Sequence, residues 1–140
     1  MIKEAAARGT PAEESERLAC TCAYLADERK AEQIVVLNVG RLTFFTDYFV
    51  IATGRNERQI KAIADEIRLR TMALGRPVVG IEGLPASGWV LIDLGDVIVH
   101  LFNSETRLIY DLELLWGEAP RSQWQTIQPL TAPAGTGPSA

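Results

Sequence analysis

The sequence predicts an α/β fold built on a mixed five-stranded sheet flanked by helices. Short, largely β-branched apolar runs at 34–39, 48–53 and 78–81 have the length of strands, and a helical pattern separates the second run from the third. The stretch 89–102 contributes two more strands, because its two apolar runs flank Gly95-Asp96, a pair typical of a two-residue hairpin turn. A strand–helix–strand crossover runs parallel, whereas hairpins are antiparallel, so the sheet is mixed.

The first helix is predicted over 12–29. Leu18, Cys22 and Leu25 fall at i, i+4 and i+7, which places them on one buried stripe. The next two strands are apolar at successive positions, as strands buried on both faces are.

A second helix is predicted to begin after Asn56, a residue type that caps helix N-termini, with Gln59 at the reciprocal capping position. Gly75 is placed to end it. Its predicted buried stripe consists of Ile60, Ile63, Ala64 and Ile67.

The hairpin at 89–102 separates its side chains onto two faces. Folding at Gly95-Asp96 sets Leu94 opposite Val97 and Leu91 opposite His100. One face is wholly aliphatic and is expected to be core; it carries Val90, Ile92, Leu94, Val97, Val99 and Leu101. The other mixes bulky apolar groups with an acid and an imidazole, so a helix or another protein should cover it; it carries Trp89, Leu91, Asp93, Ile98, His100 and Phe102.

Ser104 is expected to cap a last helix that Gly117 and Pro120 end. Its predicted buried stripe is Leu108, Leu112, Leu115 and Trp116. Tyr110, Asp111 and Glu113 lie off this stripe and are candidates for an exposed acidic-aromatic patch.

The expected organisation is a mobile leader over 1–11, one folded domain over 12–120 and a disordered tail over 121–140. The tail is rich in Pro, Gly, Ser, Thr and Ala, a composition that buries little apolar surface. The sequence leaves open whether Trp124 packs back onto the domain.

The chain of 140 residues has a net charge of −4, which argues against a large non-specific or a sequence-specific nucleic-acid interface and favours a basic protein surface as partner. We find no apolar run near the ~20 residues that span a bilayer and no signal or transit pattern, so the predicted location is the cytoplasm.

Cys20 and Cys22 are two residues apart on a helix, which disfavours a disulfide, and a lone pair of cysteines is a weak indication of a metal site.

One alternative is a magnesium-dependent nucleotidyltransferase-like enzyme. Asp93 and Asp96 resemble a spaced acidic pair, and Gly54-Arg55 before a helix resembles a weak phosphate-binding turn. However, Asp96 falls in the hairpin turn, where Asp is common for local hydrogen bonds, and there is no Walker-type lysine loop. His100, the one histidine, has Asp93 diagonally across the hairpin but no well-placed Ser or Cys, which favours a structural or interface pair. No catalytic residue, metal ligand or cofactor site is therefore assigned.

Four segments carry a specific resemblance, in order along the chain. They are Asp47-Tyr-Phe-Val-Ile-Ala-Thr-Gly54, Ile81-Glu-Gly83, the hairpin 89–102 and Tyr110-Asp-Leu-Glu-Leu-Leu-Trp-Gly117. Together they resemble the Iojap-like ribosomal silencing factor family over about Leu18 to Pro120.

The resemblance implies a nucleotidyltransferase-like topology without enzymatic activity. It further implies binding to the large ribosomal subunit through its ribosomal protein fourteen, which blocks subunit association and represses translation under nutrient limitation. Family members are often homodimers when free, and organellar relatives act in large-subunit assembly, so an assembly adaptor is a further alternative.

The expected partner-binding surface combines the mixed face of the hairpin with the last helix. Aromatic residues at such spacing can equally belong to the core, although Trp and Tyr are enriched at interface hot spots. The predicted partner-binding residues are Trp89, Asp93, His100, Tyr110, Glu113 and Trp116.

Overall fold

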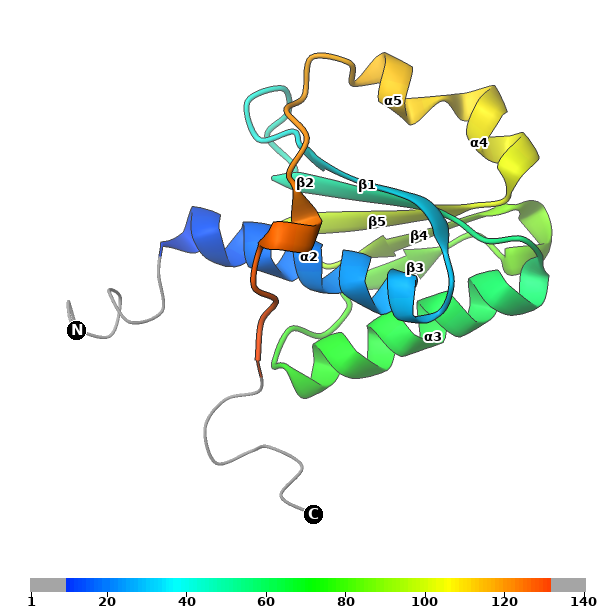
Figure 1. The fold of residues 1–140 in the computed structure, drawn as a ribbon, viewed down its shortest axis with the longest axis horizontal. Coiled ribbons are helices and arrows are strands. Elements are labelled where there is room, and N and C mark those ends of the chain that lie inside the picture. Colours follow the sequence, from blue (N-terminus) through cyan, green and yellow to red (C-terminus); the bar gives the residue numbers. More distant parts are fainter. Residues whose placement is uncertain (1–9, 132–140) are drawn as a thin grey trace.

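A computed structural model describes residues 10–131 and contains the predicted mixed five-stranded sheet. The strand order is β1-β2-β5-β4-β3, with β2 and β5 parallel and the other neighbours antiparallel (Figure 1). The strands are β1 (Glu32–Asn38), β2 (Tyr48–Thr53), β3 (Gly80–Glu82), β4 (Trp89–Asp93) and β5 (Val97–Phe102).

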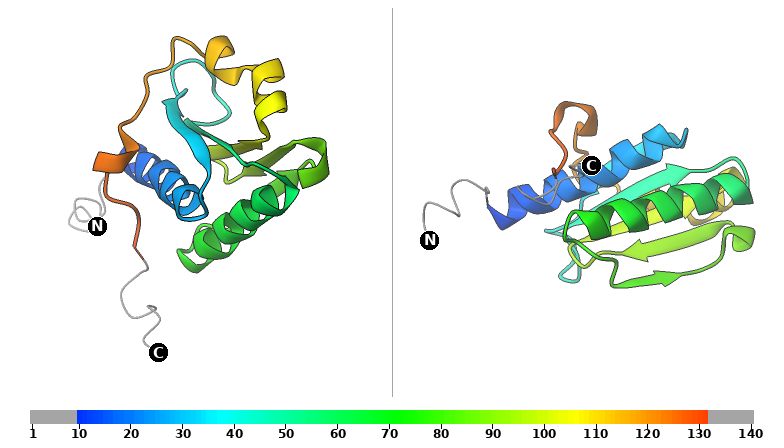
Figure 2. Two further views of the ribbon diagram at one scale, coloured as in Figure 1. Left: turned by 45° about the vertical axis from the view of Figure 1, so that its right-hand side comes forward. Right: turned by 90° about the horizontal axis from the view of Figure 1, so that it is seen from below.

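The helices lie on both faces of this sheet. Figure 2 shows α2 and α3 side by side on one face, whereas α4 and α5 lie on the other. The helices are α2 (Pro11–Glu28), α3 (Glu57–Ala73), α4 (Ser104–Tyr110) and α5 (Leu112–Leu115), with short 3₁₀ turns η1 (Pro85–Ser87) and η2 (Trp124–Thr126).

The boundaries of α3 follow local capping chemistry. The Asn56 side chain accepts a hydrogen bond from the Gln59 N–H at 2.9 Å, as predicted. The Gln59 side chain accepts instead from the Arg55 N–H at 2.6 Å, one residue before the predicted position. Gly75 follows the last turn of the helix at a φ of 81°, which confirms the predicted end.

The hairpin register is confirmed, since Asp93 pairs with Ile98 and Leu91 with His100. The aliphatic face of the hairpin packs beneath α2 and α3 in one core cluster. The mixed face belongs to a second cluster, on the side of α4 and α5, in which Phe49 of β2 and Phe102 are buried. Because β2 and β5 are buried at every residue, both faces of the sheet centre need a cover.

The predicted single last helix is wrong. Its N-cap is Asn103, not Ser104, because the Asn103 side chain accepts from the Thr106 N–H at 2.8 Å. The helix stops at Asp111, which adopts a left-handed conformation with a φ of 33°. The Asp111 side chain then caps α5 by accepting from the Leu114 N–H at 3.2 Å. Because the helix is broken here, the predicted apolar stripe does not face the sheet as a whole: Leu112 is buried, whereas Leu108 is exposed.

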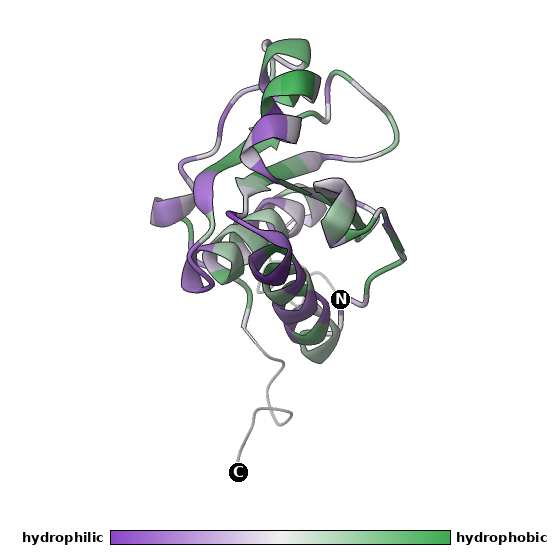
Figure 3. Ribbon diagram, turned by 90° about the vertical axis from the view of Figure 1, so that its right-hand side faces the viewer, coloured by the Kyte–Doolittle hydropathy of each residue, from purple (hydrophilic) through white to green (hydrophobic). Residues whose placement is uncertain are grey.

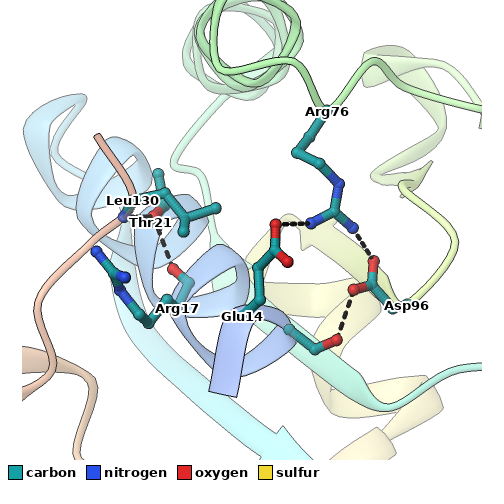
Figure 4. Close-up of polar contacts among 7 residues, drawn as sticks. Glu14, Arg17, Thr21, Arg76, Asp96 and Leu130 are labelled. Carbon is teal, nitrogen blue, oxygen red and sulfur yellow. Dashed lines mark hydrogen bonds and ion pairs between the residues drawn. The ribbon is translucent and has the colours of Figure 1, made fainter. Parts of the chain in front are cut away.

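Residues 121–131, which we call the C-terminal segment, pack against α2, so the expected disorder from residue 121 is wrong for this part of the chain. Trp124 is 8% exposed and meets the Tyr24 ring edge-on at a centroid distance of 5.2 Å. The Arg17 guanidinium donates to the carbonyl oxygens of Gln128 and Pro129. The Leu130 N–H donates to the Thr21 hydroxyl at 2.8 Å (Figure 4). The leader predicted over 1–11 and the rest of the tail lie outside the described residues, except that Thr10 caps α2 and Pro11 begins it.

Helix α2 is consequently buried around much of its circumference, between the sheet and the C-terminal segment. This explains why Cys20 and Cys22, although two residues apart, are both buried. Both are free thiols, as predicted, and burial raises the pKa of each to about 12. They are consequently protonated and unreactive at neutral pH.

Asp96 of the hairpin turn ties three parts of the chain together. Its carboxylate accepts from the Ser15 hydroxyl of α2 at 2.6 Å and from the Arg76 guanidinium at 2.6 Å. Arg76 also lies 3.5 Å from the Glu14 carboxylate (Figure 4). Asp96 therefore has a structural role between α2 and the loop that follows α3.

If the C-terminal segment is an integral part of the fold, Trp124→Ala will destabilise the protein. We expect a loss of about 3 kcal/mol in the free energy of unfolding, because the change leaves a cavity against Tyr24. Urea unfolding followed by circular dichroism measures it. The neighbouring Gln125→Ala, at an exposed side chain, should stay within about 0.5 kcal/mol of the parent. Equal stability of the two variants would contradict the packing described here.

Candidate functional site: the α4–α5 surface

Only a few side chains on the inner side of α4 and α5 pack against the second core cluster, on this face of the sheet. Leu112 is buried, and the half-buried Trp116 packs edge-on against Phe49 at a centroid distance of 5.1 Å. Arg107 is also turned inward and is 7% exposed. These two short helices therefore reach the sheet through a small number of side chains.

The outer side of the same helices is apolar. Its residues, which we call the α4–α5 surface, are Leu108, Ile109, Tyr110, Leu114 and Leu115, with exposed fractions of 81, 75, 52, 77 and 72%. Figure 3 shows these helices at the top of the view, where hydrophobic stretches of the ribbon alternate with hydrophilic ones. Contiguous exposed apolar side chains of this kind mark interaction surfaces in soluble proteins.

An aromatic cluster connects this surface to the sheet. Tyr110 lies against Trp89 with a centroid distance of 4.6 Å, and Trp89 in turn lies 5.0 Å from Phe102. The Trp89 indole N–H donates to His100 Nδ1 at 3.2 Å. Tyr110 is thus held from below by rings that belong to the hairpin.

His100 is buried within this cluster, at 5% exposure. It meets Phe49 edge-on at 4.7 Å, and its Nε2 has no hydrogen-bond partner among residues 10–131. Burial lowers the pKa of His100 to about 4, because the charged imidazolium would be desolvated. The ring is therefore neutral at neutral pH.

An ion pair fixes α5 against α4. The Arg107 guanidinium donates to the Glu113 carboxylate at 3.0 Å and to the Thr53 hydroxyl, at the end of β2, at 2.8 Å. Arg121 lies 3.6 Å from the same carboxylate. Glu113 thus neutralises a buried cation, and its position is set by the fold.

The structure places the six predicted partner-binding residues on the α4–α5 side of the sheet, but not as one exposed patch. Trp89, His100 and Tyr110 form the aromatic cluster, and Trp116 joins it through Phe49. His100 does not reach the surface and supports the residues above it.

Asp93 and Glu113 are engaged within the chain. The Asp93 carboxylate accepts from the Gly95 N–H at 2.8 Å in the hairpin turn. The pairing of Asp93 with His100 considered from the sequence is wrong, since the partner of His100 is Trp89.

The features that suggested nucleotidyl transfer are separated in the structure. Asp96 is bound to Ser15 of α2, on the opposite side of the sheet from the face that Asp93 shares with His100. The Gly54 N–H donates to the Phe102 carbonyl and the Arg55 N–H to Gln59, so these groups are already bonded. Over residues 10–131, no three His, Cys, Asp or Glu side chains are grouped as metal ligands.

Sequence reasoning missed the apolar residues that dominate the surface. The predicted stripe wrongly places Leu108 and Leu115 in the core, and it gives no role to the exposed Ile109 and Leu114. The signal that could have found them is Asp111, because Asp favours N-cap positions and tolerates the left-handed conformation that breaks the helix.

Comparison with known proteins decides the family. A family model described as "Ribosomal silencing factor during starvation" (RsfS) matches residues 12–138. The chain belongs to the RsfS family.

Among relatives in the RsfS family, the ribosomal silencing factor RsfS of Halalkalibacterium halodurans is 45% identical over 101 residues, which is 72% of this chain and 86% of that protein. The RsfS of Bacillus subtilis is 42% identical over 98 residues, or 70% and 83% of the two chains. A crystal structure of a Chromobacterium violaceum protein matches with a TM-score of 0.69 and 34% identity, covering 71% of this chain and 83% of that one. In the described part of this RsfS chain, no helix is long and apolar enough to cross a bilayer.

Glu113→Gln will weaken the anchoring of α5 against α4. The substitution leaves the buried Arg107 charge without its nearest counter-charge, so we expect a loss of about 1–3 kcal/mol in unfolding free energy. Urea unfolding measures the loss, and Glu105→Gln, at an exposed site in the first turn of α4, is the matched control. Identical unfolding midpoints would show that the ion pair carries no stability.

The buried His100 predicts a pH dependence of stability. Because its folded pKa of about 4 is below the ordinary value of 6.5, the unfolded chain takes up a proton first as the pH falls from 6.5 to 4. The contribution of neutral His100 is complete above pH 6.5, and roughly 3 kcal/mol is lost by pH 4. Urea unfolding of the parent and of His100→Gln between pH 4 and pH 7 separates the contribution of His100 to the free energy of unfolding from that of the carboxylates. Parallel curves for the two proteins would contradict it.

Proposed function

We propose that this RsfS-family chain binds the large ribosomal subunit through its ribosomal protein fourteen, blocks association with the small subunit and so represses translation under nutrient limitation. The observation that carries the proposal is the exposed apolar α4–α5 surface, together with the family membership. The function needs no catalytic residue, because occupancy of one subunit by a folded protein is enough to keep the other away.

The charges around the surface support a basic partner. Glu105, Asp111 and Glu118 are exposed on or next to α4 and α5, whereas Arg107, the basic residue between them, is buried and paired with Glu113. Arg121 is an exposed cation next to Glu113, so a basic ribosomal protein would meet a rim with more acidic than basic groups around an apolar centre. Complementary charge of this kind accelerates association and fixes orientation more than it adds affinity.

The predicted contact residues have graded roles in this proposal. Tyr110 touches the partner directly from its half-exposed position, and Trp89 and Trp116 contribute the parts of their rings that remain accessible. His100 and Glu113 hold these residues in place from beneath. Asp93, at the hairpin turn, lies at the edge of the contact.

Two further properties belong to the proposal. We expect the free chain to form a homodimer, since association would cover apolar residues that are otherwise exposed to water. We also expect it to act in the cytoplasm, where the subunits join.

Sucrose-gradient sedimentation of purified subunits tests the proposed function. With the protein present, we expect it to sediment with free large subunits, and joined ribosomes should decrease in proportion to its concentration. Co-sedimentation without a decrease in joined ribosomes would instead favour a role in subunit assembly. Absence from the large-subunit fractions would overturn the proposal.

Leu114→Glu, on the α4–α5 surface, should weaken binding to the large subunit at least about tenfold, because it places a charge in the desolvated centre of the interface. Leu69→Glu is the matched control: this side chain is 51% exposed on α3, on the opposite face of the sheet. The two variants should have similar unfolding midpoints. Equal loss of binding in both would exclude the α4–α5 surface as the contact.

A further inference from the structure

A pocket of about 340 Å³ lies beside the α4–α5 surface, between the start of β4 and the end of α4. We propose that it receives a lysine or arginine side chain of the partner protein. This inference rests on the proposed function and names the chemistry of one part of that contact. The pocket is lined by Glu82, Gly83, Ser87, Trp89, Leu91, Thr106 and Tyr110.

The walls of the pocket are aromatic. Trp89 and Tyr110 form a tilted pair with a centroid distance of 4.6 Å and an interplanar angle of 44°. Indole and phenol faces attract cations through their electron-rich π systems, and Trp is the strongest of the aromatic side chains in this respect. The Trp89 indole N–H does not compete with a cation for the ring, since it is already bonded to His100.

The acidic group of the pocket is Glu82. It is exposed, and its pairing with Leu91 across β3 and β4 places it on the face of the sheet that carries Trp89 and His100. The lining includes no lysine or arginine, so in the described part of the chain no cation of the protein fills the pocket. A cation above two aromatic rings and beside a carboxylate is the complement of this set.

The position of Glu82 is fixed by the next residue. Gly83 has a φ of 85°, and a Cβ built there would lie 2.2 Å from the Trp89 carbonyl oxygen. Only glycine allows the turn to approach the backbone of Trp89 this closely. The turn therefore keeps Glu82 and Trp89 together in the lining of one pocket.

Three of the segments that carry the family resemblance meet at this pocket. Glu82 and Gly83 belong to the segment Ile81-Glu-Gly83, Trp89 and Leu91 to the hairpin, and Tyr110 to the last segment. The exposed apolar residues of α4 and α5 give no role to the segment Ile81-Glu-Gly83. A cation-binding pocket gives it a role in the same contact.

Titration with small amides tests the pocket without the ribosome. In ¹⁵N-labelled protein, the Trp89 indole N–H resonance, assigned with a Trp89→Phe variant, is followed as the N-acetylated amide of arginine, lysine or norleucine is added, so that no probe carries an α-ammonium charge. We expect the two cationic side chains to shift the resonance and the neutral norleucine side chain to leave it in place. Glu82→Gln should weaken the response about two- to fivefold, whereas Glu105→Gln should not change it. Equal responses to all three amides would overturn the proposal.

Binding to the large subunit tests its use. Glu82→Gln should weaken binding about two- to fivefold relative to Glu105→Gln, with unchanged unfolding midpoints in both. If the parent protein binds and these two variants bind equally, the pocket proposal fails and the proposed function stands. If the parent does not bind at all, the proposed function fails, and the amide titration still decides whether the pocket holds a cation.

Discussion

The two-sided burial of the parallel strands β2 and β5 is the constraint on which the remaining structure depends. Every residue of both strands is buried, so an apolar cover is needed above and below the sheet centre. Helices α2 and α3 supply 18 and 17 residues on one face. The other face receives α4 and α5, with only 7 and 4 residues. The asymmetry of these covers explains both where the core is thick and where the surface is apolar.

The short cover leaves apolar side chains that face water. Helices of 7 and 4 residues joined at a left-handed Asp111 cannot keep one continuous stripe toward the sheet, so Leu112 turns inward and Leu108 and Leu114 turn outward. In a protein without a binding partner, polar residues at these positions would improve solubility at no cost in stability, because exposed apolar side chains contribute nothing to folding. Their presence is consistent with a second molecule that completes the cover.

The pattern of the chain predicted the fold where burial alone decides the structure. Strands β2, β4 and β5, the hairpin register and the buried stripes of α2 and α3 follow from the alternation and spacing of apolar residues. The same pattern failed to predict the structure where a single polar group or a contact distant in sequence determines the local conformation. Asp111 breaks the last helix through its own side-chain bond, and the C-terminal segment is ordered by contacts between Arg17 or Tyr24 and residues about a hundred positions away. Such contacts cannot be predicted from local composition, which is why the segment was expected to be disordered.

The same distinction applies to the candidate site. Trp89 and Tyr110 were identifiable because they are aromatic and lie, respectively, on the mixed face of the hairpin and off the predicted apolar stripe of the last helix. The sequence could not show that Glu113 faces Arg107 or that Glu82 and Trp89 line one pocket. An interface that works by occupancy gains affinity when its residues are already held in the bound arrangement, since less conformational entropy is then lost on binding. The ion pair beneath α5 and the rings beneath Tyr110 provide that rigidity. In the proposed function, the buried polar groups of this face therefore act on binding through the shape they impose on the apolar residues above them.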